Sequence, residues 1–294
     1  MCIDNCIRSD NGCSGTAGTG SDISGGGCSG RERDCSIGRC RDSDRDRGSD
    51  NDNGSNNTVV GSQALNHNTT SNNTAMGYGA AYCSTGCQNT AIGSLALRGT
   101  CTSSGTKNVA VGYTALCKIT TGGLNVAVGT NALKCNTSSC SNTAIGYNSL
   151  LVNDAPSNTA VGKDSMESNT SGNNNTAVGA DALAANTTAC NNVALGKSAL
   201  AANTTGSVNV AVGKEALLSN TTGARNTALG GYCFYYNTTG NDNVALGVSA
   251  LEASTTASRM VVIGKDAAYK YNHSDGNQVI IGYQAGYELT TGSF

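Results

Sequence analysis

Cysteine is the residue type in this 294-residue chain with the widest chemistry, because a thiolate can act as a nucleophile, a metal ligand or a disulfide partner. Cys83 with Cys87, and Cys135 with Cys140, lie close enough in sequence to clip a loop. Cys117 and Cys135 lie almost one sequence repeat apart, so they could stack. These five are the candidate disulfide residues, and free, half-buried thiols are the alternative. Bridges would need an oxidising compartment or a dedicated oxidase.

Six further cysteines belong to residues 1–56, a segment that differs in kind from the rest of the chain. It holds 7 of the 10 arginines and mixes both signs of charge densely between Arg31 and Asp52. We predict an attachment segment that is stapled by disulfides and docks on a larger assembly. A flexible, solvated tail is the alternative. A zinc site is a weaker option, because the segment has no histidine and no close Cys-x-x-Cys pair.

Catalytic constellations are not evident. The two histidines, His67 and His273, stand in polar, turn-like surroundings with no serine or cysteine partner set by a motif. Neither a phosphate-binding GxxxxGK[ST] loop nor an acidic, glycine-rich calcium nonapeptide occurs. The sequence therefore predicts a protein that is not an enzyme and needs no cofactor.

Aromatic residues collect near the end of the chain, where nine of the 13 lie beyond Gly230. One group is Tyr232, Phe234, Tyr235 and Tyr236, and a second follows from Tyr269 onwards. Aromatic rings can stack on sugars, so the first group is a candidate ligand-contact site. Packing between chains, or a cap on the end of the array, is the alternative.

Seven asparagines at one phase of the repeat stand in the Asn-x-Ser/Thr pattern of glycosylation acceptors. All seven lie seven residues after a repeated glycine: Asn68, Asn136, Asn169, Asn186, Asn203, Asn220 and Asn237. Repeated turn chemistry explains the same pattern. Because Met1–Cys6 has neither a basic start nor an apolar run, no secretory signal is predicted, and we favour the structural explanation.

These residues are set in a repeat that fills residues 57–294. Its anchor is a glycine that recurs 14 times, and eight of the 13 intervals are 17 residues long. The unit is Asn-(Thr/Val)-Ala-(Val/Ile/Leu)-Gly-x-x-Ala-Leu-x-x-Asn-Thr-Thr-Gly-x-x, as in the copy that starts at Asn209. The anchors are Gly61, Gly77, Gly93, Gly112, Gly129, Gly146, Gly162, Gly179, Gly196, Gly213, Gly230, Gly247, Gly264 and Gly282.

Such a unit predicts one coil of a parallel β-solenoid. The short, partly β-branched run before the anchor glycine is typical of a strand. Asn-Thr-Thr-Gly is turn chemistry, with a glycine that tolerates left-handed backbone. The two large apolar side chains of each coil, if buried, would contribute roughly 1.5–3 kcal/mol each. Ordering the backbone costs on the order of 1–2 kcal/mol per residue, so we expect chains to associate laterally, most simply as a homotrimer. Fourteen coils make a rod of roughly 65 Å at about 4.8 Å each.

Composition excludes several classes of partner. A net charge of −2 implies no nucleic-acid partner, and no apolar run is long enough for membrane insertion. The chain has no Trp, one Pro and 13% charged residues, which resembles a fibre more than a globule.

The repeat Asn-x-Ala-Val-Gly-x-x-Ala, seen for example at Asn192–Ala199, resembles the head repeats of trimeric autotransporter adhesins. It looks even more like the Asn-Thr-Ala-x-Gly-x-x-Ala-Leu arrays of phage and giant-virus fibre proteins. The resemblance covers residues 57–294 and implies a trimeric β-roll of left-handed type, used as a shaft or head. The unit is longer than the usual adhesin head repeat, and the adhesin signal peptide, coiled-coil stalk and membrane anchor are not evident in this sequence.

Three functions follow as hypotheses. The first is a structural fibre or appendage on the surface of a virus particle, with an adhesive role as an addition. The second is an adhesin head on a bacterial surface that binds host matrix or glycans. The third is an ice-binding solenoid, which adjacent threonines such as Thr204 and Thr205 disfavour, because neighbouring strand residues point to opposite faces.

Overall fold

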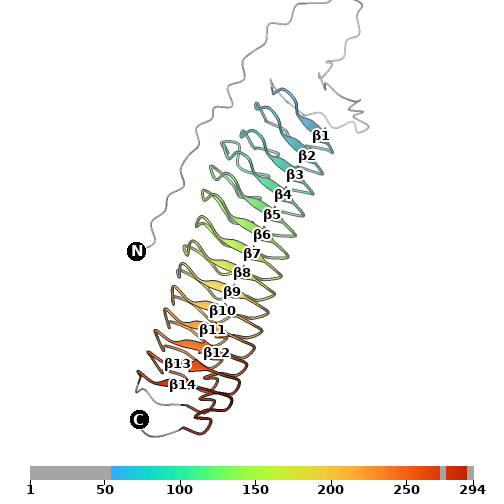
Figure 1. Ribbon diagram of the computed structural model, residues 1–294. Helices are drawn as coiled ribbons and strands as arrows, with labels where there is room; N and C mark the ends of the chain where they lie inside the picture. The colour runs from blue at the N-terminus through green and yellow to red at the C-terminus, as the bar shows by residue number, and fades with distance from the viewer. Residues whose placement is uncertain (1–53, 272–275, 290–294) are drawn as a thin grey trace, which may run out of the picture.

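The computed structural model describes residues 54–271 and 276–289, which form a parallel β-solenoid (Figure 1). Fourteen three-residue strands stack in chain order into one sheet, and the described residues contain no helix. The strands are β1 (Thr58–Val60), β2 (Thr74–Met76), β3 (Thr90–Ile92), β4 (Val109–Val111), β5 (Val126–Val128), β6 (Thr143–Ile145), β7 (Thr159–Val161), β8 (Thr176–Val178), β9 (Val193–Leu195), β10 (Val210–Val212), β11 (Thr227–Leu229), β12 (Val244–Leu246), β13 (Val261–Ile263) and β14 (Val279–Ile281). Each anchor glycine directly follows a strand, so the predicted all-β solenoid with one coil per repeat is confirmed.

Some predictions concern other parts of the molecule or other chains. Residues 1–53, which make up nearly all of the predicted attachment segment, lie outside the described residues, as does His273. The trimer and the left-handed type of the roll stay predictions.

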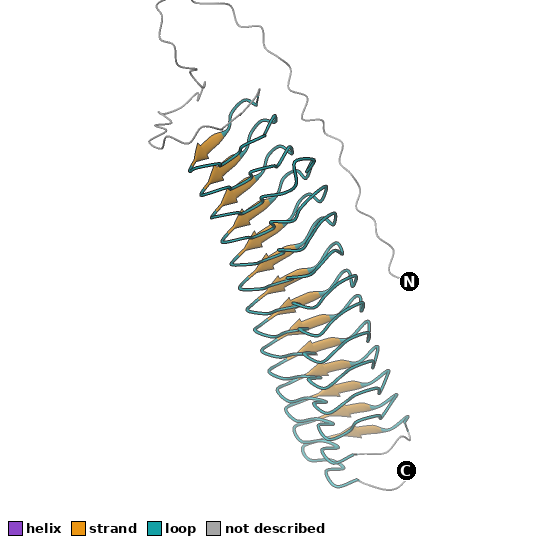
Figure 2. Ribbon diagram, turned by 180° about the vertical axis from the view of Figure 1, so that it is seen from behind, coloured by secondary structure: helices purple, strands orange, loops and turns teal. Residues whose placement is uncertain are grey.

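Most strands present one alanine side chain to a narrow interior. In β10, Ala211 is fully buried and pairs in register with Ala194 of β9 and Ala228 of β11. Because adjacent strand residues point to opposite faces, Val210 and Val212 face outwards and are only half-buried. The opposite wall of the interior comes from the residues three and four positions after each anchor glycine, most often alanine and leucine. Figure 2 shows how the loops carry the chain from each strand around to this wall and back.

The anchor glycine makes the corner at the end of every strand. Its φ lies between 119° and 141° in all 14 copies, a region that is essentially restricted to glycine. It also comes very close to the next coil: a Cβ built on Gly213 would lie 2.6 Å from the carbonyl carbon of Gly230. Glycine is therefore required both by the backbone angle and by the space.

Left-handed backbone also occurs at non-glycine positions after the corner. Glu215 and Leu217 have φ values of 58° and 52°, and their counterparts in other coils are similar. With this geometry Leu217 is fully buried in the interior, and its N–H donates to the carbonyl oxygen of Cys233 in the next coil at 3.0 Å. A left-handed leucine is uncommon, so the stacking of the coils must stabilise it.

The glycine of Asn-Thr-Thr-Gly does not have the left-handed backbone that its turn chemistry suggests. Gly223 lacks a positive φ, so that expectation is wrong. A Cβ on Gly223 would instead collide with the carbonyl oxygen of Gly240 in the next coil. In this coil the glycine serves close approach between coils and not left-handed backbone, and alanine occupies the same position at Ala189 and Ala257.

Two rows of buried asparagines run along the interior. In the first, the N–H of Asn209 donates to Oδ1 of Asn192 at 2.8 Å, and its Nδ2 donates to the carbonyl oxygen of Gly223 at 2.9 Å. In the second, Nδ2 of Asn220 donates to Oδ1 of Asn203 at 2.8 Å. These side chains are fully buried, and leaving such a group unsatisfied would cost about 1–3 kcal/mol. The asparagines therefore tie each coil to its neighbours.

The coil between Gly146 and Gly162 is one residue shorter than the common 17-residue coil, and the Asp154 side chain supplies a hydrogen-bond acceptor there. In a regular coil, three consecutive N–H groups such as those of residues 170–172 converge on one carbonyl oxygen of the next coil, that of Thr187. At the shortened coil the corresponding groups, the N–H groups of residues 137–139, converge on Oδ1 of Asp154 at 3.0–3.3 Å. A carboxylate thus takes the place of a backbone carbonyl.

Replacing an anchor glycine is expected to destabilise the solenoid, whereas replacing its neighbour is not. Gly230→Ala should lower the free energy of unfolding by at least about 1–3 kcal/mol, because alanine would be held in a glycine-only region and pressed against Gly247. The matched control is Gly231→Ala, where the nearest atom to the new Cβ is 3.9 Å away. Chemical denaturation followed by circular dichroism measures both. Equal stability of the two variants would contradict the role given to the corner.

Asp154 is expected to make stability depend on pH in acid. Burial alone raises the pKa of Asp154, but the hydrogen bonds from residues 137–139 outweigh it, so the pKa lies below its ordinary value. A carboxyl with a lowered pKa stabilises the fold above its unfolded pKa of about 3.9, and that contribution is lost as pH falls through the folded pKa.

Asp154→Asn should therefore cost on the order of 1 kcal/mol at pH 7, and the gap to the wild type should close in acid. Asp181→Asn, two coils away, is the control. Denaturation curves at several pH values measure the gap, and a gap that stays constant from pH 7 to pH 2 would disprove this role.

Candidate functional site

An apolar row runs along the outside of the sheet, and we call it the outer stripe. It consists of the residue immediately before each anchor glycine: Val60, Met76, Ile92, Val111, Val128, Ile145, Val161, Val178, Leu195, Val212, Leu229, Leu246, Ile263 and Ile281. These side chains face solvent, with exposed fractions that reach 54% at Val60 and 62% at Ile281. A continuous apolar surface of this length is typical of a protein–protein contact.

The orientation of the outer stripe corrects the expectation that both large apolar residues of a coil are buried. Only the leucine four residues after the glycine fills the core, and alanine occupies the inner face of the strand in most coils. The repeat unit itself indicates this outward orientation of the residue before the glycine. The first strand position is threonine in half of the coils and shares its face with the third, because side chains two apart point the same way.

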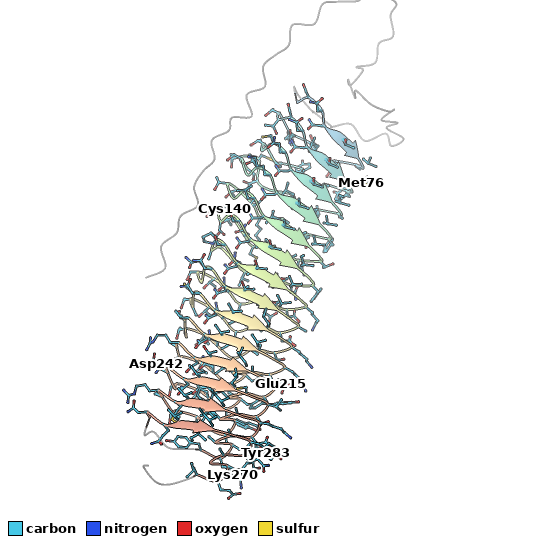
Figure 3. All side chains as sticks on the ribbon, viewed as in Figure 1. Met76, Cys140, Glu215, Asp242, Lys270 and Tyr283 are labelled. Carbon is cyan, nitrogen blue, oxygen red and sulfur yellow. A yellow bond between two sulfur atoms is a disulfide. The ribbon has the colours of Figure 1, made fainter. Side chains whose placement is uncertain are left out.

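Exposed tyrosines border the outer stripe one residue after the anchor glycine. They are Tyr78, Tyr113, Tyr147 and Tyr283. Figure 3 shows Met76 and Tyr283 projecting outwards near opposite ends of the array, with Glu215 along the same edge. The surface beside the strands therefore offers apolar contacts along the array, with tyrosines in its first half and in its last coil.

The predicted aromatic contact group divides in the structure. Phe234 is fully buried, because it occupies the leucine position of its coil, so its assignment as a ligand contact is wrong. Tyr232 and Tyr236 are exposed, and Tyr235 packs against both, with ring centroids 6.1 and 4.5 Å away. Lys214 Nζ lies 4.8 Å from the ring centroid of Tyr232.

The second aromatic group continues the same edge towards the last coil. Tyr269 and Tyr287 stack with parallel rings 5.0 Å apart. The hydroxyl of Tyr269 donates to Glu252 at 3.2 Å, and Lys270 pairs with Glu288 at 2.8 Å. Ring faces, carboxylates and ammonium groups thus alternate along this edge.

The glycosylation-like asparagines have a structural role in the folded chain. All seven are fully buried. Asn203, for example, donates from Nδ2 to Asn186 Oδ1 and to the carbonyl oxygen of Gly206, both at 3.0 Å. Because this nitrogen is the atom that would carry a glycan, the folded coil offers no acceptor there.

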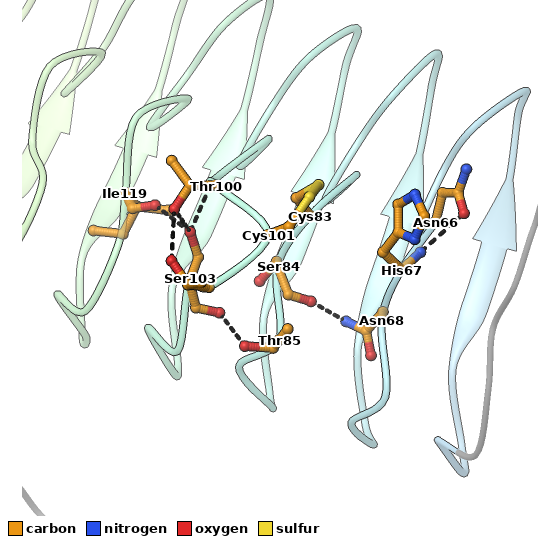
Figure 4. The surroundings of a disulfide bond; sticks show 11 residues. Asn66, His67, Asn68, Cys83, Ser84, Thr85, Thr100, Cys101, Ser103 and Ile119 are labelled. Atoms are coloured by element: carbon orange, nitrogen blue, oxygen red, sulfur yellow. Dashed lines mark hydrogen bonds between the residues drawn. A yellow bond between two sulfur atoms is a disulfide. The ribbon is translucent and has the colours of Figure 1, made fainter.

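One disulfide joins two adjacent coils, Cys83 with Cys101 (Figure 4). Their Cα atoms lie 4.2 Å apart. The predicted Cys83–Cys87 pair is therefore wrong, because stacking brings residues of similar phase in successive coils together, while residues four apart follow the path of one coil. The partner was missed because the 19-residue interval from Gly93 to Gly112 shifts Cys101 out of phase.

The remaining candidate cysteines differ in state. Cys87 and Cys140 are buried and disulfide-bonded. Cys135 is a free thiol, so the predicted loop clip with Cys140 is wrong, and Cys117 is free as well. Burial raises the pKa of the Cys117 thiol, and the nearby Lys134 lowers it in part. Cys233 is a free thiol in the core, where burial raises its pKa to about 12.

Metal and membrane chemistry find no support in the part of the chain that the structure describes. No group of three or more His, Cys, Asp or Glu residues there could hold a metal ion. None of the described segments forms a helix able to cross a bilayer. His67 packs edge-on against Tyr82, with ring centroids 5.6 Å apart.

Most of the threonine pairs form two rows along the array: the first threonine of such a pair is hydrogen-bonded to the next coil, and the second is exposed. Thr204 donates from its hydroxyl to the carbonyl oxygen of Thr221 in the next coil at 3.0 Å, whereas Thr205 is exposed. The same holds for Thr221 and Thr222. A single row of exposed threonines does not favour the ice-binding hypothesis.

Comparison with protein-family models, with curated proteins and with solved structures gave no match.

The free thiols are expected to react in an order set by their burial. In the native protein at pH 8, iodoacetamide should alkylate the half-buried Cys117 and Cys135 and leave Cys233 unmodified, because Cys233 is fully buried and mostly protonated. In guanidinium chloride all three should react. Peptide mass mapping measures each site, and native labelling of Cys233 at the rate of Cys135 would contradict the described core.

Proposed function

We propose that this chain is a non-enzymatic structural protein, the shaft or head of an appendage on the surface of a virus particle. Its coils associate with copies of the same chain through the outer stripe, most simply as a homotrimer. Residues 1–56 attach the shaft to a larger assembly. The protein needs no cofactor and has no nucleic-acid partner.

The outer stripe is the observation that carries this proposal. A solenoid coil encloses mainly alanine and leucine, so its core is thin, and its larger β-branched and aliphatic side chains face outwards. Burying that surface against another copy removes apolar area from water at about 25 cal/mol per Å². The stripe is straight and continues through all 14 coils, which suits a partner of the same length and pitch.

The sparse chemistry of the surface supports a structural role over a catalytic one. Most side-chain hydrogen bonds of the array join one coil to the next, as those of Asn192 and Asn209 do. The thiol with the most strongly raised pKa, Cys233, lies in the core and is not accessible to a substrate. A mechanical element needs such internal bonding and no reactive group.

A second candidate function is adhesion, as an extracellular appendage or as a bacterial surface adhesin. The exposed rings of Tyr232 and Tyr236 favour it, because Tyr combines an apolar face with a hydroxyl that can donate. Host glycan or matrix protein would be the partner. A glycan array probed with the wild type and with Tyr235→Ala and Tyr236→Ala variants tests this function, and unchanged signals in both variants would reject these residues as the contact.

The structural proposal predicts the mass of the assembly. Light scattering of the full chain should give about three times 29.5 kDa. The double variant Val178→Asp, Val212→Asp places charges on the outer stripe and should reduce the mass to that of one chain. The control Thr188→Asp, Thr222→Asp places charges on the row of exposed threonines and should leave the trimer intact.

Two results would count against this proposal. A wild-type chain with the mass of a monomer would remove the lateral assembly. An absence of its peptides from purified particles of the producing virus, measured by mass spectrometry, would remove the virion role. Far-UV circular dichroism of each variant shows whether the coils remain folded.

A further inference from the structure

A recess of about 300 Å³ opens on the surface of the first three coils. It is lined by Gln63, Tyr78, Gly79, Tyr82, Leu95 and Arg98. Three of these residues occupy the same position in successive coils, two residues after the anchor glycine. Gln63 and Leu95 carry side chains there and Gly79 does not, so the gap between them is one side chain wide.

The backbone does not require a glycine at this position. Gly79 has a φ of 60°, but Asn131 and Asp181 adopt φ values of 61° and 59° at the same place in other coils. A Cβ on Gly79 would have one near neighbour, Leu95 Cδ2 at 3.1 Å, and no backbone atom is close. The effect of Gly79 is therefore to leave an open space where other coils have a side chain.

The walls of the recess are held in place by a disulfide, a backbone hydrogen bond and a ring contact. The Cys83–Cys101 disulfide lies next to Tyr82 in the chain and joins the two coils that supply Tyr82 and Arg98. The N–H of Cys83 donates to the carbonyl oxygen of Arg98 at 3.0 Å. On its other side, Tyr82 packs against His67. Such support reduces the ordering cost that a ligand would otherwise meet.

The lining combines one cation with ring faces and one amide. Arg98 is the one charged residue among the six, and a guanidinium suits a carboxylate because it can donate two parallel hydrogen bonds. Tyr78 and Tyr82 offer ring faces and hydroxyl groups, and Gln63 offers both a donor and an acceptor. A ligand that complements this set has a carboxylate on a compact ring that carries further hydroxyl groups.

We propose that this recess binds an acidic saccharide, with the sugar carboxylate on Arg98, the sugar ring against Tyr78 and Tyr82, and a ring hydroxyl on Gln63. The departures of these coils from the regular repeat, namely Gly79, the longer interval after Gly93 and the disulfide, all contribute to this one place. None of the outer-stripe residues lines the recess, and Tyr78 lies between the two.

The experiment uses the full chain and three classes of soluble probe in saturation-transfer NMR and calorimetry. Sialyllactose and a glucuronate-containing tetrasaccharide are the acidic sugars, lactose is the neutral sugar, and benzoate is a ring carboxylate without hydroxyl groups. At least one acidic sugar should bind, with the strongest transfer to the ring that bears the carboxylate. Binding of neither acidic sugar, equal binding of lactose, or equal binding of benzoate would overturn the proposal.

Two variants locate the binding. Arg98→Gln should weaken it about tenfold or more, because a charge-assisted hydrogen bond is lost. Gly79→Asn should abolish it, since the new side chain fills the gap at a φ that asparagine accepts elsewhere in the array. The matched control, Ser249→Asn, makes the same change at the same position of a distant coil and should bind like the wild type.

Wild-type affinity in Arg98→Gln would overturn the site, as would retained binding in a folded Gly79→Asn variant or lost binding in Ser249→Asn. Circular dichroism shows whether each variant is folded. If Gly79→Asn does not fold, Arg98→Gln decides the question, because the Arg98 side chain is exposed and its loss leaves the coil intact.

Discussion

Every coil of this molecule completes its hydrogen bonds only through the coils beside it. The strand N–H and C=O groups, most amides of the buried asparagines and the left-handed turns after each glycine find partners one repeat away. This mutual dependence forces the coils into register and into close contact, and the close contact excludes side chains at the corner glycine. Register, small-residue core and glycine spacing are thus three results of one constraint.

The sequence was sufficient to predict the type of fold, because the constraint makes the same residue types recur at a regular spacing. Fourteen anchor glycines predict 14 strands, and each strand lies where the spacing places it. The buried role of the sequon-like asparagines could also be preferred from their phase, since a residue that recurs at one position of successive coils meets its own copies in the stack.

Other features could not be predicted from the sequence, because they depend on the direction in which side chains and backbone point and not on the spacing of residues. The residue before each glycine looked like core, yet it faces outwards, since the inner face is too narrow for more than alanine in most coils. Leu217 and its counterparts were not expected to be left-handed. The partner of Cys83 depended on how a longer coil bulges, which no period describes. The recess at Gly79 appears only when three coils are stacked.

The substitution of a carboxylate for a backbone carbonyl at Asp154 bears on how such a gene can change length. Loss or gain of one whole repeat by recombination leaves every remaining coil next to an equivalent coil, so the shorter or longer protein keeps all hydrogen bonds between coils. Loss of a single codon in the turn before Gly162 removes the oxygen on which three N–H groups would converge, and the carboxylate of Asp154 supplies a replacement. Rod length can thus change by whole repeats without loss of hydrogen bonds, whereas the shorter coil before Gly162 keeps its bonds through the carboxylate of Asp154.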